Sequence, residues 1–156
     1  MPYNAQEMIK AEQVIDLKGT TKEEVLHELC DVLSKSDKVT DPEDLYRKIL
    51  EREKTLSTGV GVGLALPHVK IPTIRDFVIG IGRHKAGVDF QSIDGKPAHI
   101  IVMIGCHESQ SGDYMKVLSK LVRSLKEKDF QRKVLLAESP QEVVDLFVGP
   151  GGVFAC

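Results

Sequence analysis

The sequence predicts a mixed α/β fold of the α+β-like kind, in which a mixed β-sheet is flanked by helices on both faces. Amphipathic helical patterns occupy both ends of the chain, and apolar β-branched stretches lie between them. The chain has 156 residues, of which 42% are apolar and 28% are charged, as is usual for one globular domain. We expect this domain to span residues 1–148, with residues 149–156 as a flexible C-terminal tail.

Two helices are predicted in the first third of the chain, over residues 20–33 and 42–54. The first opens on a capping box that a threonine at 20 or 21 forms with the glutamate three positions later. The second opens on Asp41, a good N-cap, followed by a proline suited to the first helical position. Both segments then carry apolar residues at helical spacing, so that one face of each helix should be buried.

The middle of the chain has the features of strands. Residues 56–70 are glycine-rich and predict a loop plus a short strand that ends at His68. Phe77–Arg83 and His99–Cys106 are the strongest strand candidates, and the second is apolar enough to be covered on both faces. The rest of the chain predicts three helices, over residues 113–126, 129–137 and 140–147.

Composition excludes several classes of function. The formal net charge of −2, the absence of Trp and an aromatic content of 5% argue against a nucleic-acid partner. The longest apolar run, Ile100–Cys106, is far shorter than the ~20 residues of a membrane span. The N-terminus has no signal-peptide pattern, and the three cysteines are distant from one another. We therefore expect a cytoplasmic protein without a membrane span.

The candidate chemistry lies between residues 52 and 68. An imidazole directly after a proline, as at His68, is held by a stiff backbone and is a usable nucleophile and reversible phosphoryl acceptor. The backbone N–H groups of Gly59 and Gly61 could stabilise an anionic phosphoryl group. Arg52 could clamp that anion, and the Thr58 hydroxyl could donate a hydrogen bond to it.

Each of these residues also has an ordinary structural interpretation. A lone histidine after proline is commonly a surface or hydrogen-bonded residue, and Arg52 could simply be a solvated residue on a helix face. The glycine series does not match the nucleotide-binding patterns GxGxxG or GxxxxGK[ST]. Residue types and spacing alone therefore leave both interpretations open.

The run REKTLSTGVGVGLALPH, from Arg52 to His68, resembles the phosphorylation-site signature of a known family. This family is the IIA component of the bacterial phosphoenolpyruvate-dependent sugar phosphotransferase system (PTS), of the fructose/mannitol type, which includes the nitrogen-regulatory IIA proteins. The similarity continues through residues 87–105, 114–125 and the last helix, and covers roughly residues 6–147.

This resemblance implies the mannitol-type IIA fold and a phosphotransferase activity with a phosphohistidine intermediate. His68 would accept a phosphoryl group from an HPr-type phosphocarrier protein and pass it to a IIB domain, or its phosphorylation would regulate a target protein. Arg52 would help to bind the phosphoryl group. The resemblance implies neither a metal ion nor any other cofactor at the site.

The sequence departs from the family pattern at three positions. Many transport members have a second active-site histidine where this chain has Tyr114, whose hydroxyl can donate a hydrogen bond but does not exchange a proton near neutral pH. Val62 occupies a usual Asn or His position, and His107 a usual Pro position. We hypothesise that His107 partly replaces the missing histidine; the alternative is an exposed loop histidine.

Three functions stay open at this point. A stand-alone phosphocarrier is the leading hypothesis, and the loss of the second histidine favours the nitrogen-regulatory branch. The first alternative is a non-catalytic regulatory or partner-binding domain with the same fold. The second is a sugar-specific component of fructose or mannitol uptake.

Overall fold

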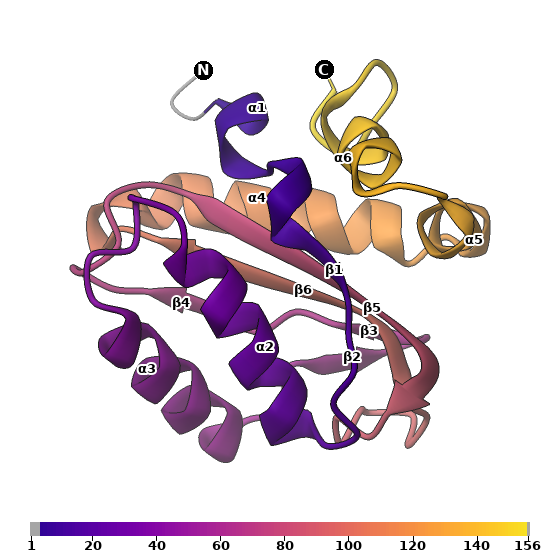
Figure 1. Ribbon diagram of the computed structural model, residues 1–156, viewed down its shortest axis with the longest axis horizontal. Helices are drawn as coiled ribbons and strands as arrows, with labels where there is room; N and C mark the ends of the chain where they lie inside the picture. The colour runs from indigo at the N-terminus through magenta and orange to yellow at the C-terminus, as the bar shows by residue number, and fades with distance from the viewer. Residues whose placement is uncertain (1–3, 156) are drawn as a thin grey trace.

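The computed structural model describes residues 4–155, and it places a mixed β-sheet between two layers of helices (Figure 1). Helices α2 (Lys22–Ser34) and α3 (Pro42–Thr55) cover one face of the sheet. Helices α4 (Ser111–Leu125) and α5 (Lys128–Leu136) cover the other. Each helical layer shares its own apolar core with the sheet. The predicted fold class is therefore confirmed.

The sheet is organised around its most buried strand, β6 (Ala98–Cys106), which pairs antiparallel with β5 (Val78–Val88). Strand β1 (Val14–Asp16) is parallel to β5 at one edge. On the other side of β6 lie β3 (Leu64–Ala65) and β4 (His68–Lys70), both parallel to it, and β2 (Gly59–Gly61) pairs antiparallel with β3. The strand order is β1-β5-β6-β3-β2, with β4 beside β6.

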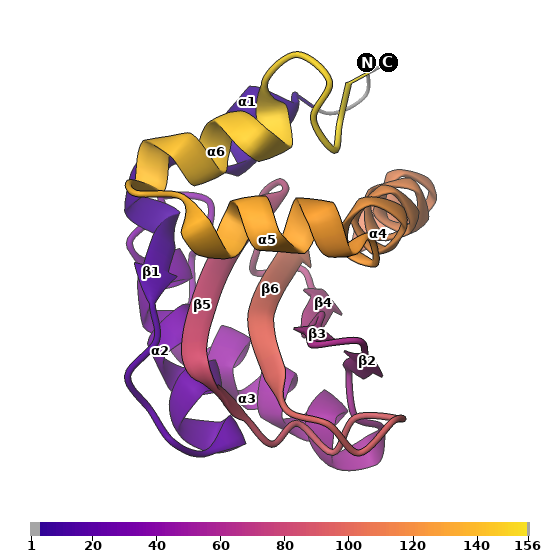
Figure 2. The same cartoon turned by 90° about the vertical axis from the view of Figure 1, so that its right-hand side faces the viewer.

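The remaining short elements lie at one end of the sheet. Figure 2 shows α6 (Pro140–Val148) beside α1 (Ala5–Met8), and α6 also packs on η1 (Ala11–Gln13). A 3-10 turn, η2 (Glu108–Gln110), joins β6 to α4. The elements before α2 are only three or four residues long and show no periodicity, so the sequence did not predict them.

The predicted helix starts are confirmed. The Thr21 side chain accepts a hydrogen bond from the backbone N–H of Glu24, and the Glu24 side chain accepts one from the backbone of Thr21. The Asp41 side chain accepts from the N–H of Asp44 at the start of α3, and the Ser139 side chain accepts from the N–H of Glu142 at the start of α6. Pairing orphan N–H groups at its first turn stabilises each helix by about 1 kcal/mol.

The glycine-rich segment differs from its prediction. Residues 56–70 form three short strands, and His68 begins the last of them instead of ending a strand. The backbone has positive φ angles at Gly61, Val62 and Gly63, which turn the chain from β2 into β3. Glycine adopts this conformation without strain. The alternation of glycine with apolar residues therefore encodes a tight hairpin, where the sequence analysis predicted a loop plus one short strand.

The segment predicted as a flexible tail is packed in its described part. Val153 and Phe154 are buried in the core that the sheet shares with α4 and α6. The backbone N–H of Phe154 donates to the carbonyl of Phe147 at 3.2 Å. These two apolar side chains beyond the last helix pack into the core. Composition alone did not predict this packing.

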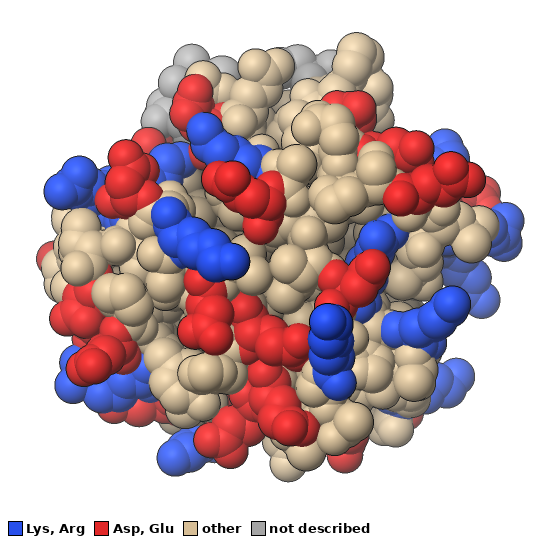
Figure 3. Space-filling model, viewed as in Figure 1, with Lys and Arg blue, Asp and Glu red and all other residues tan. Residues whose placement is uncertain are grey.

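The surface over α2 is predominantly acidic. Figure 3 shows acidic side chains gathered over this helix, with basic side chains more dispersed around them. Glu23, Glu24, Glu28 and Asp31 all lie on this helix. Within residues 4–155, every helix is too short or too polar to cross a bilayer.

Candidate functional site

His68 is held at the start of β4 by the central strand of the sheet. Its register partner in the parallel pair β4–β6 is Ile104, whose N–H donates to the carbonyl of Pro67 at 2.9 Å. The side chain of His68 is half-buried. Because the part of β6 that pairs with β4 is buried, the backbone that carries the imidazole has little freedom to move.

The two ring nitrogens of His68 have different partners. Nδ1 lies 2.6 Å from the carbonyl oxygen of Leu66, and Nε2 lies 3.0 Å from Nη2 of Arg52. A carbonyl only accepts hydrogen bonds and a guanidinium only donates them. We therefore assign the ring proton to Nδ1, which leaves the lone pair of the neutral imidazole on Nε2.

The surroundings of the ring favour its neutral form. Burial lowers the pKa of His68 from its usual value, the Leu66 carbonyl opposes this shift, and the positive charge of Arg52 adds to it. Glu53 opposes the shift more weakly, and the net direction is downward. A neutral ring keeps the nucleophilic lone pair on Nε2 available at neutral pH.

Helix α4 places Tyr114 against His68. The two ring centroids are 5.7 Å apart, and the planes meet at 53°. Burial raises the pKa of Tyr114 to about 12, although the charge of Arg52 works in the opposite direction. The phenol is thus a permanent hydrogen-bond donor and not a second proton carrier. Lys70 Nζ also lies over the Tyr114 ring, 5.6 Å from its centroid.

A small cavity of about 210 Å³ opens beside His68. Arg52 and Thr58, both predicted as site residues, line this cavity with His68. Helix α4 contributes an apolar wall to it. The sequence analysis did not identify this wall or the contribution of Ser57. The other described residues of the lining are Leu56, Val60, Leu66, Leu118 and Val122.

Thr58 is tied to Glu53, a residue that the sequence analysis did not identify. The Thr58 hydroxyl donates a short hydrogen bond to Glu53 Oε1, and its backbone N–H lies 3.3 Å from both carboxylate oxygens. Both residues are buried. In this structure the hydroxyl of Thr58 therefore holds the end of α3, and its predicted bond to a phosphoryl group stays a prediction.

The structure does not bring Gly59 and Gly61 into the cavity among its described lining residues. A Cβ atom at Gly59 would lie 2.4 Å from Ser92 Oγ. Gly61 has a φ of 87°, and a Cβ there would lie 3.2 Å from the Asp94 carboxylate. These glycines allow the hairpin to pack closely on the segment that precedes β6. The structure thus gives a packing reason for both, and their part in phosphoryl binding stays a prediction.

His107 has partners of its own at the start of η2. Its Nδ1 lies 2.7 Å from Ser109 Oγ and accepts a hydrogen bond from the Ser109 N–H at 3.1 Å. His107 is not among the described partners of His68, which are Leu66, Arg52 and Tyr114. The ring therefore serves as a cap, and Tyr114 is the aromatic neighbour of His68.

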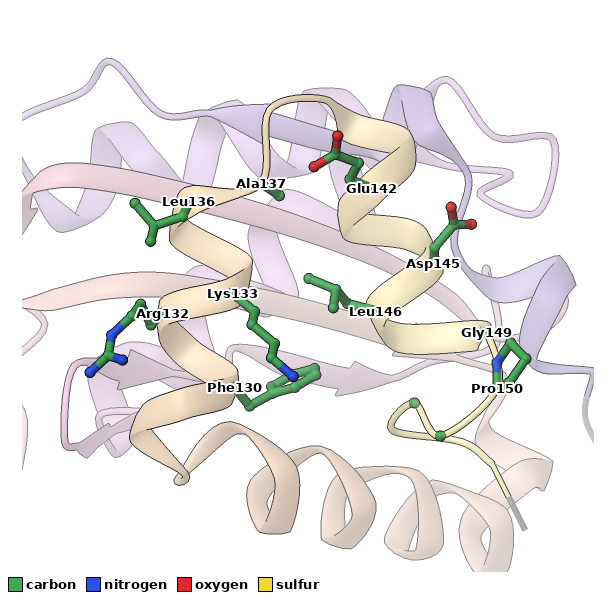
Figure 4. Close-up of a pocket in the computed structure, with 12 residues that line it drawn as sticks. Phe130, Arg132, Lys133, Leu136, Ala137, Glu142, Asp145, Leu146, Gly149 and Pro150 are labelled. Atoms are coloured by element: carbon green, nitrogen blue, oxygen red, sulfur yellow. The ribbon is translucent and has the colours of Figure 1, made fainter.

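A larger groove, of about 810 Å³, lies between α5, α6 and the loop after α6 (Figure 4). Charged and apolar side chains both line it, and Leu146 of α6 points toward α5. Among its described lining residues are none of the predicted site residues. Its size therefore does not mark it as the site of the His68 chemistry.

The fold places the chain in the class of phosphotransferase-system IIA domains. The model of one protein family, described as "Phosphoenolpyruvate-dependent sugar phosphotransferase system, EIIA 2", matches residues 7–148. The chain belongs to this family, as the Arg52–His68 segment predicted.

Curated relatives include both fructose-specific and nitrogen-regulatory proteins. The chain is 36% identical over 132 residues to the "PTS system fructose-specific EIIABC component" of Bacillus subtilis, covering 85% of this chain and 21% of that protein. It is 36% identical to the "PTS system fructose-specific EIIA component" of Haloferax volcanii, covering 81% and 82%. It is 28% identical to the "Nitrogen regulatory protein" of Bradyrhizobium diazoefficiens, covering 86% and 87%. The chain thus spans about a fifth of the B. subtilis protein.

Solved structures show the same fold. The nitrogen regulatory protein IIA-Ntr of Neisseria meningitidis superposes with a TM-score of 0.84 at 26% identity, covering 89% of this chain and 95% of that one. The mannitol enzyme IIA of Escherichia coli, solved in complex with phosphorylated enzyme IIB, gives 0.74 at 22% identity, covering 88% and 94%. The expected mannitol-type IIA fold is confirmed.

Proposed function

We propose that this protein is a phosphocarrier that accepts a phosphoryl group on Nε2 of His68 and passes it on. The observation that carries the proposal is the pair of contacts on the imidazole. The Leu66 carbonyl fixes the proton on Nδ1, and the Nε2 lone pair accepts from the Arg52 guanidinium, a donor that can turn to an incoming anion. Nε2 is therefore the nucleophile.

The transfer can be written with these groups alone. The Nε2 lone pair attacks the phosphorus of a phosphohistidine on a donor protein, and a new N–P bond forms as the donor's N–P bond breaks. The bonding electrons return to the imidazole of the donor. Arg52 gives up its hydrogen bond to Nε2 and donates to the phosphoryl oxygens instead, where its positive charge stabilises their negative charge. The Nδ1–H of His68 stays bonded to Leu66 and supports the charge that the ring gains.

The proposed partners are an HPr-type phosphocarrier protein as donor and a IIB domain or a regulatory target as acceptor. Family membership and the exposed edge of the cavity support this assignment. Leu56, which lines the cavity, is 72% exposed, and Met115, on α4 beside Tyr114, is 64% exposed. Large exposed apolar side chains around a reactive group suit transient docking of a partner protein.

The downstream role is a choice between regulation and sugar uptake. The nitrogen-regulatory branch, which the sequence analysis favoured, has the support of the structural similarity to IIA-Ntr. The fructose branch has the support of the higher sequence identity, 36% against 28%. Transfer of the phosphoryl group to a IIB cysteine would assign the protein to uptake. A carrier that is phosphorylated and donates to no IIB domain would belong to the regulatory branch.

The proposal is tested by incubating the protein with phosphoenolpyruvate, enzyme I and an HPr-type carrier. Intact-mass analysis should show the addition of one acid-labile phosphoryl group. The addition should vanish in His68→Ala and persist in His27→Ala, a matched change at an exposed histidine of α2. A folded protein that takes no phosphoryl group from any such carrier would instead be the non-catalytic regulatory domain.

A further inference from the structure

A buried ion pair lies behind the site. Lys22, the first residue of α2, places its Nζ 2.6 Å from Glu53 Oε2, near the end of α3. The side chains of Lys22 and Glu53 are 16% and 5% exposed. Nζ also lies 5.2 Å from the centroid of the Phe90 ring and 3.5 Å from the Phe90 carbonyl. The ammonium group thus has partners in two segments of the chain, at the end of α3 and at Phe90.

A continuous series of hydrogen bonds connects this ion pair to the imidazole. Glu53 accepts from the hydroxyl and the backbone N–H of Thr58. The Thr58 carbonyl accepts from the N–H of Leu66 at 3.0 Å. The Leu66 carbonyl in turn faces Nδ1 of His68 at 2.6 Å. The carbonyl that sets the tautomer of His68 is therefore positioned by Thr58, and Thr58 by Glu53.

The charge of Lys22 decides how Glu53 behaves. A buried carboxylate that loses its cation either takes up a proton or turns to another positive group. Arg52 is its neighbour in sequence, and the Arg52 guanidinium now donates to Nε2 of His68. Because Lys22 neutralises the Glu53 carboxylate, Arg52 can donate to Nε2 of His68. The Glu53 carboxylate stays an acceptor for Thr58.

We propose that Lys22 is a positioning residue for phosphoryl transfer, which acts on His68 through Glu53, Thr58 and Leu66 without contacting the ring. This inference rests on the proposed function of His68. None of the described residues that line the cavity belongs to α2. The inference nevertheless gives this helix a part in fixing the tautomer of His68.

The test compares the tautomer of His68 and the rate of phosphoryl acceptance in variants of the full chain. In the wild type, nitrogen-15 chemical shifts of the ring should show one neutral tautomer with the proton on Nδ1. Lys22→Met should give a mixture of tautomers and lower the single-turnover rate of acceptance about tenfold or more, a loss typical of a residue that orients a reactive group. Lys22→Arg should retain the tautomer and most of the rate.

A double variant separates the effect of the charge of Lys22 from the effect of its shape. In Lys22→Met combined with Glu53→Gln, the amide oxygen still accepts from Thr58 and no unpaired charge is buried. This double variant should regain most of the rate that Lys22→Met loses. Should Lys22→Met fail to fold, Lys22→Gln, which keeps a hydrogen-bond donor, replaces it with the same expectations. Lys35→Met, at the exposed end of α2, removes the same charge and should change nothing.

The inference is overturned if folded Lys22→Met loses stability alone and keeps both the single tautomer and the wild-type rate. It is also overturned if the double variant is no faster than Lys22→Met. The ring measurement needs no phosphoryl donor. A wild type that accepts no phosphoryl group therefore contradicts the proposed function, whereas an unchanged tautomer in Lys22→Met contradicts the role of Lys22.

Discussion

Nη2 of Arg52 lies 3.0 Å from Nε2 of His68, so the nitrogen assigned as nucleophile is occupied by a donor at rest. The guanidinium must give up this hydrogen bond before phosphorus can approach. An incoming phosphoryl group presents several anionic oxygens, to which a guanidinium can donate two parallel hydrogen bonds, whereas a single ring nitrogen accepts only one. The proposed function therefore requires this contact to open when the anion arrives.

Replacing Arg52 should slow phosphoryl acceptance far more than it destabilises the fold. We expect Arg52→Ala to lower the single-turnover rate by about 10²–10³-fold, as for other donors aimed at developing negative charge. Arg123→Ala, at an exposed position of α4, is the matched control and should leave the rate unchanged. Rapid-quench measurement with a phosphorylated donor checks this, and an Arg52→Ala variant as fast as the wild type would refute the assignment.

The low pKa of His68 makes stability depend on pH in a defined direction. Burial, aided by the charge of Arg52, lowers the pKa of the folded ring below the usual value of 6.5. Below about pH 6.5 the unfolded chain therefore binds a proton that the folded chain resists, and the free energy of unfolding falls as pH decreases. Above that pH this dependence disappears.

This pH dependence should be reduced in His68→Gln, which has no ring to protonate. Urea unfolding of both proteins between pH 5 and 8 measures the difference, with His27→Gln as the control at an exposed histidine. Parallel pH curves for the wild type and His68→Gln would show that the pKa of His68 is not lowered by folding.

Tyr114 should contribute to stability through its ring and to the site through its hydroxyl. It is buried in the core between α4 and the sheet, so we expect Tyr114→Ala to cost about 3–5 kcal/mol. Tyr114→Phe keeps the packing against His68 and should keep most of the stability. Chemical denaturation measures both. Equal losses in the two variants would place the stabilising effect in the hydroxyl and contradict this account.

The backbone of Val62 adopts a conformation that is unfavourable for a β-branched residue. Its φ of 51° lies in the left-handed region, where a β-branched residue is strained, and its side chain is 48% exposed. Val62→Gly relieves the strain and keeps the backbone bonds to Asp94 and Gln131. We expect it to stabilise the fold by about 1 kcal/mol. The control, Ile93→Gly, alters an exposed residue outside this region and should not stabilise. A destabilised Val62→Gly would be incompatible with strain at this residue.

The sequence predicted those parts of the molecule whose signals are local. Capping residues such as Thr21 and Asp41 marked helix starts, because they pair with groups three residues away. The apolar run of β6 identified the central strand. The arrangement of β3 and β4 could not be predicted, because both pair with β6, which lies more than 30 residues later in the chain.

The same difference between local and long-range signals applies to the candidate site. Arg52, Thr58 and His68 are close in sequence, and the structure brings all three to one cavity. Glu53 was missed although a signal existed: it follows Leu45 and Ile49 at helical spacing, which places its carboxylate on the buried face of α3. Lys22 occupies the matching position on α2, ahead of Leu26 and Leu29. A charged residue in an apolar stripe requires a partner, but only the fold could show that these two residues pair.

The identity of the phosphorylated nitrogen tests the central claim most directly. Nuclear magnetic resonance of the ring nitrogens and the phosphorus, recorded on the protein after phosphorylation by an HPr-type carrier, locates the N–P bond. We predict phosphorus on Nε2 of His68, with the proton retained on Nδ1. Phosphorus on Nδ1, on another residue or on no residue of the folded protein would contradict the account.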